Sequence, residues 1–289
     1  MSELSTPVDG FRLAYDVVGN GPAVVLLHGW PGDRTDFRRV VPMLADHLRV
    51  VVPDLRGFGD SDRYAVPPAE GYSAAAQMRS VLGLLDDLGI AHAVFAGYDI
   101  GSRLIQTVVG QAPQRVRAAV LTPPLPGAGA RLLAAPGQAE FWYQQLHRLP
   151  LADTLLDGRP DAVRAYLAHI WNHWSGPGFA LTDEEFDAGV ARYARPGAFT
   201  SSVGWYRSRK GSVASAGAEI PPAPEARAGL PVEVLWPEHD PLFPVTWADR
   251  LGDWYADLSV QTLPGSGHFV PLEAPQEFAA AVRRAAKAG

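Results

Sequence analysis

The chain of 289 residues is 47% hydrophobic and 19% charged, which is typical of a globular protein and excludes a largely disordered one. Its net charge of -6 and its lack of basic stretches argue against a nucleic-acid or anionic-membrane partner. Because the chain has no cysteine, disulfides, thiolate catalysis and cysteine-based zinc sites are excluded.

Predicted strands and helices alternate along the first half of the chain. A strand is expected at Phe11–Val18, and continuous apolar runs predict strands buried on both faces at Ala23–Leu27, Arg49–Pro53, Ala93–Gly97 and Val116–Leu121. Helical spacing lies between them, over Thr35–Leu48, Ser73–Leu88 and Ile100–Val109. The alternation predicts an α/β fold with a mostly parallel sheet flanked by helices.

The pattern changes in the second half of the chain. Residues 138–210 show helical and aromatic segments without a clear strand, between two stretches rich in Gly, Ala and Pro. Strand patterns resume at Pro231–Trp236 and Ser259–Leu263, and a helix is expected at Phe278–Lys287. We therefore predict a core domain over 1–125 and 223–289, interrupted by a helical cap over 126–222.

Three reactive side chains follow predicted strands. Asp99 lies in G-Y-D-I-G (97–101), which has the shape of a nucleophile elbow with aspartate in place of serine. Asp240 lies in W-P-E-H-D-P (236–241) and His268 in G-S-G-H-F (265–269). Their order of nucleophile, acid and histidine predicts that they meet at the carboxyl ends of the strands.

These motifs, together with H-G-W-P-G (28–32), D-L-R-G-F-G-D-S-D (54–62) and G-H-F-V-P-L-E-A-P (267–275), resemble the α/β-hydrolases of the epoxide hydrolase and dehalogenase branch. The resemblance implies an α/β-hydrolase core with an inserted cap and no cofactor or metal. It also implies that the backbone N–H groups of Trp30 and Ile100 form an oxyanion hole.

A carboxylate nucleophile suits a substrate with a saturated carbon. Asp99 is ionised at neutral pH and can displace a leaving group directly, which forms an alkyl ester. His268, oriented by Asp240, then activates water to hydrolyse the ester. The leaving atom is expected to be an epoxide oxygen or a halide.

Epoxide hydrolases of this branch use two cap tyrosines to donate protons to the epoxide oxygen. The segment G-W-Y-R-S (204–208) resembles their motif and makes Tyr206 one donor. The second is expected in F-W-Y-Q-Q (141–145), at Trp142 or Tyr143. Trp205 and Arg103 are further candidates for lining the substrate pocket.

Dehalogenases of the branch place a tryptophan, or an arginine, directly after the nucleophile, where this chain has Ile100. We therefore predict an epoxide hydrolase whose small-molecule substrate is an apolar or aromatic epoxide, and keep two alternatives. These are a haloacid or haloalkane dehalogenase with the same nucleophile, and a non-catalytic ligand-binding protein. No apolar run reaches transmembrane length and no signal-peptide pattern opens the chain, so we expect a cytoplasmic monomer or homodimer without membrane or nucleic-acid partners.

Overall fold

A single mixed sheet organises the molecule. The computed structural model describes residues 3–208 and 218–288. Within these ranges, eight strands are arranged in the order β1-β2-β4-β3-β5-β6-β7-β8. The pairings of β2 with β1 and with β4 are antiparallel, and the remaining pairings are parallel. The predicted fold class, α/β with a mostly parallel sheet, is confirmed.

The strand boundaries follow the predicted apolar runs closely. The eight strands are β1 (Glu3–Leu4), β2 (Ala14–Val18), β3 (Ala23–Leu27), β4 (Arg49–Pro53), β5 (Ala93–Gly97), β6 (Val116–Leu121), β7 (Val232–Pro237) and β8 (Leu258–Leu263). β3 lies in the middle of the sheet, where Val25 pairs with Val51 on one side and Phe95 on the other. The short strand β1 was not predicted, because two residues carry no periodicity.

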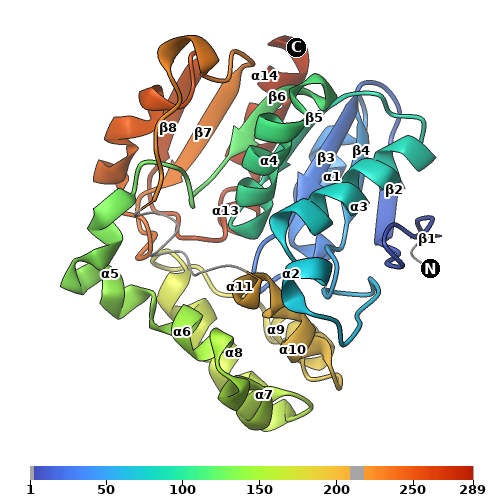
Figure 1. Cartoon of the computed structure of the whole chain (residues 1–289), viewed down its shortest axis with the longest axis vertical. Helices are drawn as coiled ribbons and strands as arrows, with labels where there is room; N and C mark the ends of the chain where they lie inside the picture. The colour runs from blue at the N-terminus through green and yellow to red at the C-terminus, as the bar shows by residue number, and fades with distance from the viewer. Residues whose placement is uncertain (1–2, 209–217, 289) are drawn as a thin grey trace.

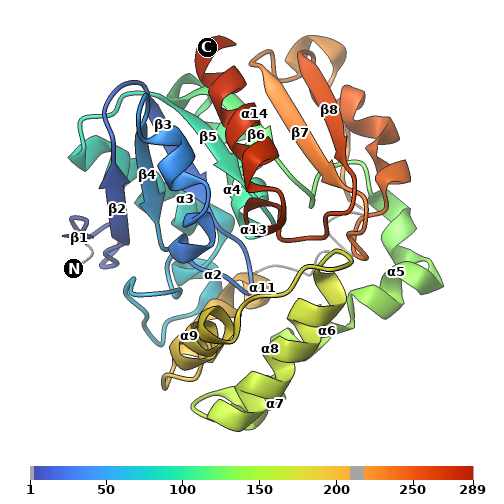
Figure 2. The same cartoon turned by 180° about the vertical axis from the view of Figure 1, so that it is seen from behind.

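Helices cover both faces of the sheet (Figures 1 and 2). The longer ones in the core are α3 (Ala74–Asp87) and α4 (Ile100–Gln111) on one face and α14 (Pro275–Ala288) on the other. Shorter elements are α1 (Val41–Leu44), α2 (Pro68–Gly71), η2 (Pro113–Arg115), η5 (Val245–Asp253) and α13 (Val270–Glu273). Among the described residues, no helix is long and apolar enough to cross a membrane.

The predicted helix over Thr35–Leu48 is wrong as a continuous element. The chain forms a 3₁₀ turn, η1 (Arg34–Phe37), and then the single short helix α1. Pro42 lies at the start of α1. Since proline has no N–H to donate to a preceding turn, it begins a helix more readily than it continues one.

A helical layer lies between β6 and β7 in the chain and covers one end of the sheet (Figure 1, lower half). Its described elements are η3 (Gly129–Leu133), α5 (Ala135–Glu140), α6 (Trp142–Arg148), α7 (Pro150–Leu156), α8 (Pro160–Trp174), α9 (Asp183–Tyr193), α10 (Ala198–Ser202) and α11 (Gly204–Arg207). The short element η4 (Pro224–Ala226) precedes β7 in the chain. The cap boundaries of 126–222 stay a prediction, and residues 209–217 within them lie outside the described residues.

Candidate active site

Asp99 occupies a sharp turn between β5 and α4. Its backbone has φ 50° and ψ -118°, a conformation that side-chain-bearing residues rarely adopt and that often marks a functional site. Gly101 lets α4 start directly against β3, because a Cβ atom at this position would lie 2.0 Å from the carbonyl oxygen of Leu27. The turn therefore has the elbow geometry that the glycine spacing predicts, and it holds the Asp99 carboxylate at the end of the sheet.

The structure brings the three predicted reactive residues together. His268 Nδ1 donates to Asp240 Oδ2 over 2.9 Å, and His268 Nε2 lies 3.4 Å from Asp99 Oδ2. The other oxygen of Asp240 accepts the backbone N–H of Leu242 at 2.8 Å. All three reactive side chains are buried, so their charges act on one another with little screening.

Two carboxylates decide the charge of His268. Burial disfavours the charged imidazolium, but the Asp240 and Asp99 carboxylates outweigh this effect and raise the pKa of His268 to about 10. The free site therefore holds a protonated histidine at neutral pH. A neutral His268 ring at this pH requires that one of its neighbouring negative charges be removed.

The second oxygen of Asp99 lies against the H-G-W loop after β3. The backbone N–H of Trp30 donates to Asp99 Oδ1 over 2.8 Å. The loop comes this close because residue 29 is glycine: a Cβ there would lie 2.4 Å from Asp99 Cβ. Ile100 is the first residue of α4, and N–H groups in the first turn of a helix have no partner within the helix. The backbone around Asp99 Oδ1 is thus suited to receive negative charge.

His28 stabilises this loop through hydrogen bonds at both of its ring nitrogens. Its Nδ1 donates to the carbonyl oxygen of Gly29 over 2.9 Å, and its Nε2 accepts the backbone N–H of Leu55 at 3.0 Å. Burial lowers the pKa of His28. A neutral ring with both nitrogens occupied is a structural support for the loop and does not exchange protons with a substrate.

A small cavity of about 30 Å³ opens onto Asp99. Its walls come from both the sheet domain and the helical layer: Asp99, Ile100, Arg103, Pro124, Leu132, Phe141, Tyr143, Gln144, Trp205, Tyr206 and Phe243. The predicted candidates Arg103 and Trp205 are therefore both wall residues. A site of this size holds only a few heavy atoms in the present conformation.

Tyr143 and Tyr206 face this cavity from α6 and α11. Their ring centroids lie 5.8 Å apart and their rings are nearly perpendicular, at 87°. Burial raises the pKa of both phenols well above the ordinary range, and the nearby Asp99 charge acts in the same direction. Both hydroxyls stay protonated at neutral pH, which suits them to donate hydrogen bonds next to the nucleophile.

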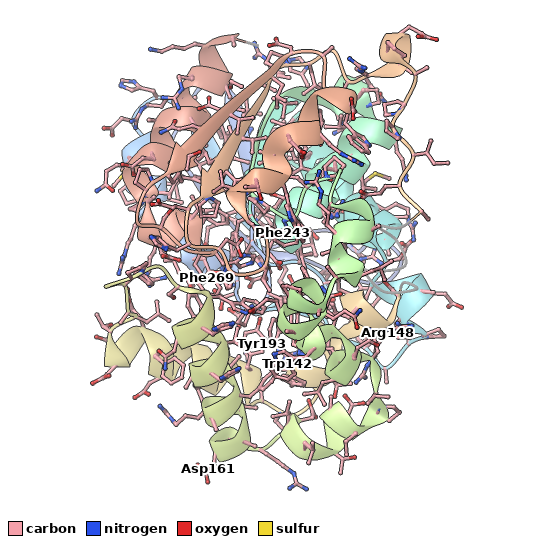
Figure 3. All side chains as sticks on the ribbon, turned by 90° about the vertical axis from the view of Figure 1, so that its left-hand side faces the viewer. Trp142, Arg148, Asp161, Tyr193, Phe243 and Phe269 are labelled. Carbon is pink, nitrogen blue, oxygen red and sulfur yellow. The ribbon has the colours of Figure 1, made fainter. Side chains whose placement is uncertain are left out.

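Trp142 does not reach the cavity. Its side chain is 39% exposed, and its ring packs edge-on against Tyr166 with centroids 6.0 Å apart. Figure 3 shows Trp142 within the helical layer, whereas Phe243 comes from the sheet domain above it. Consecutive residues of a helix point about 100° apart, so Trp142 and Tyr143 cannot both face Asp99. Tyr143 takes that direction, and Trp142 is no longer expected to be a donor.

Five wall residues were not predicted: Pro124, Leu132, Phe141, Gln144 and Phe243. Phe141 and Phe243 pack edge-to-face with centroids 5.4 Å apart, and Gln144 Nε2 donates to the hydroxyl of Tyr143 over 3.0 Å. The i, i+3 spacing of Phe141 and Gln144 could have placed both on one helix face. Phe243 lies in a loop after Asp240, where no periodic signal exists.

A larger cavity of about 250 Å³ lies elsewhere, between η1 and helices α8 and α9. Asp36, Trp171 and Tyr193 are among its lining residues, but Asp99, which lines the smaller cavity, is not. The smaller cavity is therefore the candidate active site. Within the described ranges, no cluster of three or more His, Asp and Glu side chains could hold a metal ion.

Comparison with known proteins agrees with this architecture. Residues 22–275 match a family described as the alpha/beta hydrolase fold. Epoxide hydrolase A of Mycobacterium tuberculosis is 28% identical over 324 residues, covering 97% of this chain and 96% of that protein. Epoxide hydrolase 1 of Siraitia grosvenorii is 30% identical over 223 residues, covering 69% of this chain and 70% of the relative. A solved structure described as a novel epoxide hydrolase from metagenomes of hot environments has a TM-score of 0.84 at 25% identity, covering 99% and 98% of the two chains.

Proposed function

Because this chain belongs to the α/β-hydrolase superfamily and is similar to epoxide hydrolases, we propose that it hydrolyses an epoxide to a vicinal diol through an ester on Asp99. One observation carries the proposal. A carboxylate stands on the elbow, with His268 Nε2 3.4 Å away and Tyr143 and Tyr206 lining the same cavity. This combination supplies a nucleophile, a base and two donors for the leaving oxygen.

In the first step Asp99 Oδ2 attacks an epoxide carbon. Oδ1 remains on the Trp30 N–H, so it becomes the carbonyl oxygen of the ester. As the ring carbon–oxygen bond breaks, the epoxide oxygen takes a proton from Tyr206 or Tyr143. The products of this step are a hydroxyalkyl ester and a tyrosinate, which regains its proton from solvent.

The second step needs a neutral His268. Esterification removes the negative charge of Asp99, which is one of the two charges that raise the pKa of His268. The imidazolium then loses its proton to solvent, and the neutral ring accepts one from water. Hydroxide attacks the ester carbonyl, and the N–H groups of Trp30 and Ile100 stabilise the charge on Oδ1. Cleavage of the ester bond expels the alkoxide of the diol, which takes the proton of the newly formed carboxylic acid; this releases the diol and restores the Asp99 carboxylate.

The test is to trap the ester with His268→Gln and to measure intact-protein mass after incubation with small epoxides and halogenated acids and alkanes. We expect a gain equal to one whole epoxide, mapped to Asp99 and absent in Asp99→Asn. His239→Gln is the matched control, since His239 lies beside Asp240 but its side chain is 44% exposed. It should turn over without accumulating ester.

Two results would overturn the proposal. A gain equal to a halogenated substrate minus hydrogen halide, with none from epoxides, would make the protein a dehalogenase. No adduct on Asp99 with any epoxide that the wild-type protein consumes would exclude the ester mechanism.

A further inference from the structure

Among the described residues that line the cavity beside Asp99, Arg103 is the single cation, and it is paired. Arg103, on the first turn of α4, places Nη1 3.2 Å from Glu219 Oε1. The second oxygen of Glu219 accepts the backbone N–H of Gly127 at 3.0 Å. The two charged side chains are only 19% and 18% exposed, so water screens the pair weakly.

The charges around the cavity sum to a negative value. With His268 protonated, Asp99, Asp240 and His268 together carry one negative charge. Arg103 and Glu219 cancel each other. An anion entering the cavity therefore meets a net charge of about -1, counted from these five groups alone. Neutralising Glu219 would bring this sum to zero, and neutralising Arg103 would bring it to about -2.

We propose that Glu219 determines which substrate charge the site accepts. By pairing with Arg103, it prevents that guanidinium from binding an anionic group. The site therefore takes uncharged epoxides and rejects epoxides that carry a carboxylate. This inference rests on the proposed epoxide hydrolysis. Arg103 is a wall residue and Glu219 acts through it, which makes Glu219 a positioning residue.

The small size of the cavity limits the choice of test substrates. About 30 Å³ of space favours very small molecules. Oxirane-2-carboxamide and oxirane-2-carboxylate have nearly the same shape and differ by one negative charge. We therefore divide the kcat/KM for the carboxylate by the kcat/KM for the carboxamide, and this ratio reports the charge preference of the site.

The experiment compares this ratio in wild type, Glu219→Gln, Arg103→Gln and the double variant. Glutamine at 219 retains an oxygen that can accept the Gly127 N–H, which preserves the local structure. We expect Glu219→Gln to raise the ratio about tenfold, the low end of what a released charge-assisted hydrogen bond is worth. Arg103→Gln should lower it, and the double variant should return near the wild-type value. Glu233 lies on β7, pairs with Arg284 and does not line the cavity, so Glu233→Gln is the control and should leave the ratio unchanged.

The outcomes separate the two proposals. If the wild-type protein hydrolyses neither probe and His268→Gln forms no ester with any epoxide, the proposed function fails. If the carboxamide is hydrolysed but Glu219→Gln gives the same ratio as Glu233→Gln, the function stands and the role of Glu219 is refuted. A wild-type preference for the carboxylate would refute it as well.

Discussion

The charge of His268 should depend on the charge of Asp99. In the free site the imidazolium lies between two carboxylates, and its pKa is about 10. Asparagine at position 99 keeps the shape of the side chain but removes its charge, as the ester does. Asp99→Asn is therefore expected to lower the pKa of His268 toward the ordinary range of histidine.

The size of the effect follows from one distance. His268 Nε2 lies 3.4 Å from Asp99 Oδ2, and unit charges at that separation attract by about 5 kcal/mol at an effective dielectric constant of roughly 20. One pKa unit corresponds to about 1.4 kcal/mol, so losing this attraction is a large change. In wild type the ring should stay protonated until the pH rises toward 10. In Asp99→Asn it should lose its proton at a lower pH.

The assay is a pH titration of ¹⁵N-labelled histidine by NMR, between pH 5 and 10. The chain has eight histidines, and His268→Gln assigns the signal by its loss. Asp249→Asn serves as a control, because Asp249 pairs with Arg131 through a half-exposed side chain. If His268 titrates at the same pH in wild type and Asp99→Asn, the reasoning that esterification converts it into a base is refuted.

Three further predictions concern the same site. Tyr206→Phe and Tyr143→Phe should each slow ester formation in single-turnover experiments by about 10- to 100-fold. The control variant Trp142→Phe should form the ester at the wild-type rate. Equal rates of ester formation in all three variants would show that the tyrosines are not the donors. Gly29→Ala should lower kcat by about 100-fold without changing the circular dichroism spectrum, because the new Cβ pushes the loop away from Asp99. Full activity of this variant would show that the loop tolerates the added methyl group. Hydrolysis of the wild-type ester should become faster as the pH rises and then reach a plateau, because only neutral His268 is a base. A rate that falls with rising pH would contradict this role of His268.

The elbow and its partners were predictable because their signals are local. Asp99, Asp240 and His268 each follow a segment that was predicted to be a strand and pairs in parallel, and parallel strands present their carboxyl ends at one edge of a sheet. The predicted helix over Thr35–Leu48 is wrong for a local reason too, because Pro42 in its middle begins the separate helix α1. Periodicity alone does not show where such a helix is interrupted.

By itself, then, the sequence determined the sheet, the elbow and the identity of the reactive groups, because strand patterns and turn glycines act over a few neighbouring residues. Only the tertiary structure decided that Tyr143 and not Trp142 faces the nucleophile, since the packing of the helical layer sets the rotation of α6. It alone paired Arg103 with Glu219, which are 116 residues apart in the chain. The charge of His268 likewise depends on distances to two carboxylates from separate loops, and such distances exist only once the strands are assembled.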